Sequence, residues 1–214
     1  MHRHPLDKQN QINYNEGAIR SFLMFRRLAA LFVLGILGAS CASKSAPTKE
    51  DIVSIPVVPY EPSWQCLDCS PEEKYVLEQL QDKTRITDRN ALATIMGNIK
   101  QESKFYPNIC EGGARVSYND CHRGGYGLIQ WTSTQRYLGL RYFSNKYGCD
   151  PSTLECQTRY MINEPIFQRY LPEFEGGGQS IAQYMVPAYY WLGWGIKGNR
   201  ELYAYDYTRK MVLV

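Results

Sequence analysis

The sequence predicts a mainly α-helical domain of about six helices with a small β or loop insert. Apolar residues recur at helical spacing in several stretches, and helix-starting residues precede those stretches. A segment rich in Gly, Asn, Asp and Tyr interrupts the helical pattern. The chain has 214 residues, of which 44% are hydrophobic and 13% aromatic, which is enough for one domain with a substantial core plus tails.

The N-terminal segment 1–41 has the pattern of a secretory signal. Two basic residues, Arg26 and Arg27, precede an apolar run of eleven residues that begins at Leu28. Small residues then precede Cys41, as in a signal-peptide cleavage region. The apolar run is far shorter than the roughly 20 residues that a membrane-spanning helix needs. We therefore expect export rather than a transmembrane anchor.

The cleavage region is similar to that of a bacterial lipoprotein signal, in which the lipid would be attached to Cys41. Gly38 stands where such signals most often have Leu, so an ordinary signal peptide cut nearby is the alternative. Met24 is also a better start than Met1 for a signal of this kind. Because Ala42 is not the Asp of an inner-membrane retention signal, we expect a cell-envelope protein on the periplasmic face of the outer membrane.

The charge balance changes once this signal is removed. The five basic and two acidic residues of 1–41, taken from totals of 24 and 21, leave 19 of each. A neutral mature chain gives no reason to expect nucleic acid as a partner, whereas it fits a polysaccharide. We expect a monomer that needs no cofactor.

The cysteine count supports an exported protein. With Cys41 lipidated, six of the seven cysteines remain, and six thiols beyond a secretory signal indicate three disulfides. Fifteen pairings are possible, and proximity in the sequence favours Cys66–Cys69, Cys110–Cys121 and Cys149–Cys156. The spacing of Cys66 and Cys69 also fits a zinc site, but no second Cys pair or His pair completes one.

Residues 42–70 contain four prolines and few periodic apolar positions, which indicates an extended tether. The folded domain is expected over 71–214. Pro71 and the acidic residues that follow it are typical of the first turn of a helix.

A second helix is expected from about Asp88 to Ser103. Its apolar positions are three, one and three residues apart, which places them on one helix face: Leu92, Ile95, Met96 and Ile99. Glu102 follows three residues later and so continues this apolar stripe. Partial burial raises the pKa of a carboxyl group, as a general acid requires. The spacing alone is equally compatible with Glu102 pointing into water at a frayed helix end.

Residues 104–131 are expected to form turns with a short hairpin, closed by the disulfide. Their glycines, at 124, 125 and 127, permit close approach of the backbone to a ligand. Thr132 and Ser152 each begin a capping-box pattern, and Pro165 is expected to end or kink the helix after Ser152. Further helices are expected over 181–191 and after Asn199.

Aromatic residues are concentrated in the C-terminal third of the chain. They can stack on sugar rings while their polar groups bind hydroxyls, although most are expected to belong to the core. We expect about two of these eight to contact substrate: Tyr184, Tyr189, Tyr190, Trp191, Trp194, Tyr203, Tyr205 and Tyr207.

Two motifs carry a resemblance to a known family. They are Gly97-Asn98-x-x-Gln101-Glu102-Ser103 and Gly125-Tyr126-Gly127-Leu128-x-Gln130-Trp131, with Arg136 soon after. Together with a Tyr- and Arg-bearing C-terminal helix, they resemble the phage tail lysozyme family of the lysozyme-like superfamily. Soluble lytic transglycosylases and goose-type lysozymes are related to it. The resemblance spans about residues 71–212.

This resemblance implies a lysozyme-like α-helical fold that cuts the MurNAc–GlcNAc β-1,4 bond of peptidoglycan glycan strands. Glu102 would be the catalytic acid. Gln130 would hydrogen-bond the sugar, Tyr126 and Trp131 would shape the subsites, and Ser103 would orient the carboxylate or a substrate group. The lipid signal departs from the usual setting of this family, which is a virion part.

A second catalytic carboxylate is harder to identify. The loop offers Glu111 and Asp120, and Asp120 is the better candidate because it lies next to Cys121 and shortly before the glycine loop. The pattern is also compatible with Asp120 being a turn former after Asn119. Without a second carboxylate, the sugar's own 6-hydroxyl would attack, as in a lytic transglycosylase. A non-catalytic peptidoglycan-binding envelope lipoprotein is the alternative function.

Overall fold

The computed structural model describes residues 63–214, and the expected signal segment with Cys41 lies outside this part. The described part is mainly helical, as predicted, and has seven α-helices where about six were expected. They are α1 (Pro71–Lys83), α2 (Arg89–Ser103), α3 (Thr134–Tyr147), α4 (Leu154–Asn163), α5 (Pro165–Glu175), α6 (Ile181–Leu192) and α7 (Arg200–Lys210). Two short strands, β1 (Trp64–Cys66) and β2 (Met211–Leu213), and a 3₁₀ turn (Tyr118–Asp120) complete it.

The first two helices begin where the sequence predicts. The side chain of Ser70 caps α1, with Pro71 at its first position and a reciprocal hydrogen bond from the Ser70 amide to Glu73. Asp88 caps α2 by accepting a hydrogen bond from the Ala91 amide. Both helices contribute buried residues to the core.

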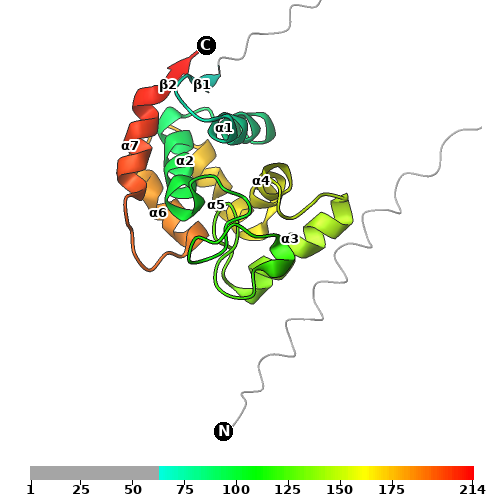
Figure 1. Cartoon of the computed structure of the whole chain (residues 1–214). Coiled ribbons are helices and arrows are strands. Elements are labelled where there is room, and N and C mark those ends of the chain that lie inside the picture. Colours follow the sequence, from blue (N-terminus) through cyan, green and yellow to red (C-terminus); the bar gives the residue numbers. More distant parts are fainter. Residues whose placement is uncertain (1–62) are drawn as a thin grey trace, which may run out of the picture. The chain divides into compact units, whose positions relative to one another are not determined.

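Helix α2 is the centre of the domain. It packs against α1, α5, α6 and α7, and α7 runs alongside it in Figure 1. The apolar stripe predicted on α2 is fully buried. Every residue from Ala91 to Ile99 is buried, so this helix is enclosed over most of its length and only its ends reach the surface.

The folded part begins earlier than the sequence predicts. Strand β1 pairs antiparallel with β2, with Trp64 opposite Leu213 and Cys66 opposite Met211. Strand β1 lies inside 42–70, the segment interpreted as a tether. The two strands are joined by more than a hundred residues of helical domain, so no local pattern marks their pairing.

The later helices differ from the prediction by small shifts. The residues that cap α3 and α4 are Ser133 and Thr153, each one position after the expected Thr132 and Ser152. Helix α4 ends at Asn163, and Pro165 is the first residue of a separate helix, α5. One expected helix is therefore two, α4 and α5, which explains the seventh helix.

The three disulfides expected from sequence proximity are present in the structure, as Cys66–Cys69, Cys110–Cys121 and Cys149–Cys156. Both sulfurs of the Cys66–Cys69 pair are bonded, so neither is free for the zinc site that their spacing also fitted. Cys110–Cys121 closes the loop between α2 and α3, where the predicted insert is found.

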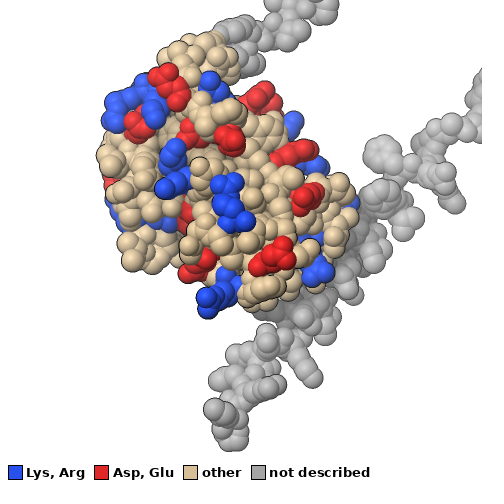
Figure 2. Space-filling model, viewed as in Figure 1, with Lys and Arg blue, Asp and Glu red and all other residues tan. Residues whose placement is uncertain are grey.

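The described surface carries both signs of charge. In the face shown in Figure 2, Lys and Arg side chains are interspersed with Asp and Glu. Residues 42–214 hold 19 basic and 19 acidic residues. Between residues 63 and 214, no helix combines the length and apolar content that crossing a bilayer requires.

Candidate active site

Glu102 lies in the last turn of α2, at the end of the buried apolar stripe. Its side chain is 16% exposed, so it is neither enclosed in the core nor free in water. The two residues that follow the helix, Lys104 and Phe105, have positive φ angles of 54° and 66°. Non-glycine residues rarely adopt this conformation, and it turns the chain sharply away just beyond the carboxylate.

A cavity of about 760 Å³ opens at Glu102. It lies where the end of α2 meets the loop before α3, the α6–α7 connection and the start of α7. Its polar lining residues are Glu102, Gln130, Thr132, Ser133, Arg136 and Arg200. Glu102 is the one carboxylate among the described lining residues, and a cavity of this size can hold sugar units.

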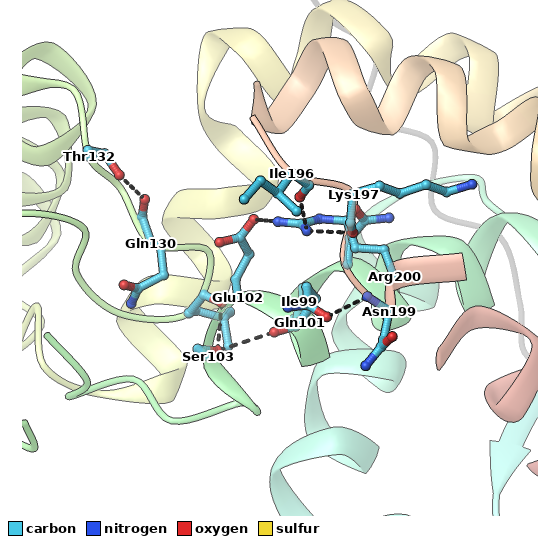
Figure 3. Close-up of polar contacts among 12 residues, drawn as sticks. Ile99, Gln101, Glu102, Ser103, Gln130, Thr132, Ile196, Lys197, Asn199 and Arg200 are labelled. Carbon is cyan, nitrogen blue, oxygen red and sulfur yellow. Dashed lines mark hydrogen bonds and ion pairs between the residues drawn. The ribbon is translucent and has the colours of Figure 1, made fainter. Parts of the chain in front are cut away.

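Arg200 is the direct partner of Glu102. Its Nη2 donates to Glu102 Oε1, while Nη1 donates to the carbonyl oxygens of Ile196 (3.1 Å) and Lys197 (2.8 Å). The guanidinium also stacks on Trp194, with 4.7 Å from Cζ to the ring centroid. Figure 3 shows the carboxylate extending toward Arg200, with Gln130 on the other side of Glu102 in that view.

The environment of Glu102 raises the pKa of its carboxyl group relative to that of an exposed glutamate. Burial raises the pKa of the Glu102 carboxyl above its usual range, and the positive charges of Arg200 and Arg136 offset part of that increase. The carboxyl therefore holds its proton to higher pH than an exposed glutamate does. This is the property that a general acid near neutral pH requires.

Two other residues of the first motif bring α7 to the cavity. A Cβ atom at Gly97 would lie 2.6 Å from the Ala204 nitrogen and 2.7 Å from the Arg200 oxygen, so the glycine permits close contact between α2 and α7. Gln101 Oε1 accepts a hydrogen bond from the Asn199 amide (2.9 Å) at the start of α7. The motif therefore positions Arg200 as well as Glu102.

Ser103 connects the two motifs instead of facing substrate. It is 2% exposed, and its hydroxyl donates to the carbonyl oxygen of Leu128 (2.7 Å) and accepts from the Phe105 amide (3.1 Å). The residue thus joins the end of α2 to the glycine loop. Its expected contact with substrate remains a prediction that this geometry does not favour.

Gln130 lines the cavity, as the resemblance implies. Its φ is 52°, so it shares with Lys104 and Phe105, which directly follow Glu102 and Ser103, a conformation that non-glycine residues rarely adopt. Its amide nitrogen donates to the carbonyl oxygens of Gly127 (3.1 Å) and Ile109 (3.3 Å). These contacts hold the side chain in place and leave its amide oxygen as a possible acceptor for a sugar hydroxyl.

Tyr126 and Trp131 are buried beneath the glycine loop and contact residues outside it. Both are fully buried, and neither is among the residues that line the cavity. Tyr126 donates to the Val116 carbonyl oxygen (3.2 Å), and Trp131 Nε1 donates to Glu164 Oε2 (3.2 Å). Their expected role in shaping subsites can therefore only be indirect.

A buried carboxylate, Glu164, was not singled out from the sequence. It is 1% exposed and accepts hydrogen bonds from Trp191 Nε1 (3.0 Å), Trp131 Nε1 and Arg136 (Nη2 at 2.6 Å). Pro165 favours extended backbone at the residue before it, and Glu164 lies at this turn between α4 and α5. Glu164 thereby holds Arg136, which lines the cavity.

Asp120 lies in the 3₁₀ turn, and its carboxylate accepts a hydrogen bond from the Ser117 hydroxyl (2.6 Å). It is exposed and does not line the cavity. Its hydrogen bond suits a residue that stabilises the turn. A catalytic role for Asp120 stays a prediction without a geometric basis here.

Of the eight C-terminal aromatic residues, Tyr190, Trp191 and Trp194 line the cavity. Tyr184 and Tyr207 are buried in the core. Sequence alone could not separate these groups, because all lie in helices or turns of similar composition.

Part of the chain matches a known protein family. Residues 72–171 match the model of the family described as phage tail lysozyme. No curated protein gives a significant match. The matched segment includes Glu102, Gln130, Arg136 and Glu164, and it ends before α6 and α7. Residues 72–171 are therefore similar to the phage tail lysozyme family, and the mainly helical structure is consistent with a lysozyme-like α-helical domain.

Proposed function

We propose that this protein cleaves the MurNAc–GlcNAc β-1,4 bond of peptidoglycan with Glu102 as the general acid. The observation that carries the proposal is the position of Glu102 as a partly buried carboxylate with a raised pKa, beside a cavity of about 760 Å³. The protonated Glu102 donates its proton to the glycosidic oxygen while the bond from that oxygen to the anomeric carbon breaks.

Arg200 has a defined part in this step. When Glu102 gives up its proton it becomes a carboxylate, and the Arg200 guanidinium already lies at its Oε1 atom. The stabilisation therefore grows as the proton leaves, which lowers the energy of the transition state more than that of the bound substrate. Trp194 and the carbonyl oxygens of Ile196 and Lys197 hold the guanidinium for this purpose.

The second half of the reaction distinguishes two enzyme types. Hydrolysis with a paired carboxylate needs a second acidic group about 5–9.5 Å from the first. Since Glu102 is the one carboxylate among the described lining residues, we favour attack by the 6-hydroxyl of the MurNAc unit. Glu102, now a carboxylate, takes the proton of that hydroxyl, and a 1,6-anhydro end forms. The enzyme would then be a lytic transglycosylase.

A muramidase that uses Asp120 is the other candidate. It requires the turn containing Asp120 to move toward the cavity when substrate binds. Asp120→Asn in the digestion described next separates the two, because it should leave turnover unchanged if Glu102 acts alone. A loss of activity of about 100-fold or more would instead identify Asp120 as catalytic.

The test of the function is digestion of purified peptidoglycan, with the released muropeptides identified by mass spectrometry. Anhydro-muropeptides are the expected products. Reducing ends would mean a muramidase, and an absence of any cleaved glycosidic bond would favour a non-catalytic wall-binding protein.

The proposal places the enzyme in the cell envelope, attached through a lipid on Cys41 to the periplasmic face of the outer membrane. The supporting pattern is the short apolar run that ends at this cysteine. A peptidoglycan glycosidase held there can reach its substrate directly. Labelled palmitate should enter the wild type and be absent from Cys41→Ser; label in both proteins would contradict the lipid assignment.

A further inference from the structure

A row of four aromatic side chains lies along the cavity, and two of the four line it. The row, here called the aromatic ridge, consists of Trp194, Tyr189, Tyr190 and Tyr170. Successive ring centroids are 5.4 Å apart for Trp194–Tyr189, 5.4 Å for Tyr189–Tyr190 and 5.9 Å for Tyr190–Tyr170. At its inner end, Trp194 stacks on Arg200, the partner of Glu102. The ridge thus begins beside the partner of Glu102 and has members both inside and outside the cavity lining.

Two members of the ridge, Tyr170 and Trp194, pack against the edge of the core, whereas the other two are exposed. Tyr190 is 56% exposed and Tyr189 is 47% exposed, although they lie on α6, a helix whose opposite face is buried. Trp194 and Tyr190 line the cavity, whereas Tyr189 and Tyr170 lie outside its lining. Tyr189 and Tyr190 together expose two large rings beside the cavity, at a cost in hydration that the fold itself does not explain.

The chemistry of the ridge fits a carbohydrate. Flat aromatic faces pack against the C–H faces of sugar rings, and tyrosine hydroxyls can bind sugar hydroxyls. All four side chains are uncharged, as is the backbone of a glycan strand.

We propose that the aromatic ridge binds the glycan strand beyond the bond that is cut, so that long strands are better substrates than short ones. This inference rests on the proposed function and adds a preference for strand length to it. A short oligosaccharide fills the cavity alone, whereas a longer one gains contacts with Tyr189 and Tyr170. The enzyme therefore prefers to act within strands rather than on short fragments.

The experiment compares the full chain and its variants on uncross-linked glycan strands separated into a four-sugar and a ten-sugar fraction. Tyr189→Ala removes one ring of the ridge outside the cavity, and Tyr189→Phe keeps the ring. Tyr142→Ala is the matched control, since Tyr142 is 68% exposed on α3 and does not line the cavity. Binding of the same strands is measured separately in a Glu102→Gln background, where no cleavage interferes.

The expected result is a loss of roughly threefold to tenfold in kcat/KM and in affinity for the ten-sugar fraction with Tyr189→Ala. Four-sugar cleavage should be unchanged, Tyr189→Phe should retain most of the long-strand activity, and Tyr142→Ala should match the wild type. An equal loss on both lengths, or no loss on either, would overturn the ridge while leaving the glycosidase intact. Absence of cleavage by the wild type would instead count against the proposed function.

A second occupant is tested by the same variants. If the ridge covers another copy of this chain, Tyr189→Ala lowers the mass measured by sedimentation without changing affinity for glycan strands. That outcome would also overturn the inference.

Discussion

Arg200 and Glu102 are 98 residues apart in the sequence, and they form a hydrogen-bonded ion pair beside the cavity. The pair depends on the contact of α2 with α7, which Gly97 permits and Gln101 supports. Burial raises the pKa of Glu102, and Arg200 limits the increase. The balance between these two effects sets the pH range over which Glu102 can donate a proton.

Removing the charge of Arg200 should shift the pH profile. Without the guanidinium, burial acts on Glu102 unopposed by its nearest positive charge, so its pKa rises further. The acid then stays protonated to higher pH. The alkaline limb of kcat/KM is expected to move to higher pH in Arg200→Met, while kcat falls because the carboxylate formed in the reaction is less stabilised.

Arg200→Lys is the control for this shift, since it keeps a positive charge near Glu102. Its alkaline limb should stay close to that of the wild type. A limb in Arg200→Met that is unmoved, or that moves to lower pH, would show that Glu102 is not the group that titrates in catalysis.

Gly97→Ala should loosen the contact between α2 and α7. The added Cβ atom would meet the α7 backbone at 2.6–2.9 Å, and the backbone cannot yield as a flexible side chain can. We expect a loss of about 1–3 kcal/mol in the free energy of unfolding in urea. We also expect kcat/KM to fall by more than the loss of folded protein accounts for. The displaced α7 would move Arg200 away from Glu102.

The comparison variant is Gly176→Ala, where the nearest atom to an added Cβ lies 3.5 Å away. Its free energy of unfolding should change by less than about 0.5 kcal/mol. Equal stability and equal kcat/KM in both variants would mean that the close helix contact does not position the site.

Glu73 should make stability depend on acid pH. It is buried between α1, α2 and α7, where it accepts hydrogen bonds from Lys100 (2.5 Å) and Tyr207 (2.6 Å). Burial by itself would raise the pKa of Glu73, but these hydrogen bonds outweigh it and hold the pKa below its usual 4.5. The folded protein thus binds this proton more weakly than the unfolded chain does. The stabilisation is present above about pH 4.5 and is lost as the pH falls through the folded-state pKa.

Glu73→Gln should therefore cost about 3 kcal/mol at neutral pH, because it removes the charge that Lys100 and Tyr207 contact. Below pH 4.5 the wild type should lose stability more steeply than this variant. Glu72→Gln, on the exposed side of the same helix turn, should behave like the wild type. Parallel curves for the wild type and Glu73→Gln would contradict the role of this network.

The sequence predicted the parts of the fold whose signals are local. Ser70 with Pro71 and Asp88 mark helix starts by side-chain chemistry that acts within four residues. The pairing of β1 with β2 depends on residues at opposite ends of the domain, and each strand has only three residues. The predicted caps of α3 and α4 are each one position too early, because the adjacent Ser and Thr side chains offer equivalent hydroxyl oxygens.

The candidate site was predictable to the extent that its residues lie on one helix face or in one loop. Glu102 and Gln130 line the cavity as the motifs imply. The motifs do not distinguish a residue that would touch substrate from one that supports the loop, so Ser103 and Trp131 were assigned to substrate although both are buried. Glu164 accepts a hydrogen bond from Arg136, which is 28 residues away in the sequence, so a local sequence pattern does not reveal this contact.

The decisive measurement is the turnover of purified peptidoglycan by Glu102→Gln, compared with the wild type and with Glu155→Gln. Glu155 is a matched control because its side chain is 68% exposed on α4. Gln cannot donate the proton that cleavage requires, so kcat/KM should fall by at least about 100-fold while thermal unfolding shows an intact fold. Glu155→Gln should keep wild-type activity. Wild-type turnover by Glu102→Gln would contradict the assignment of Glu102 as the catalytic acid.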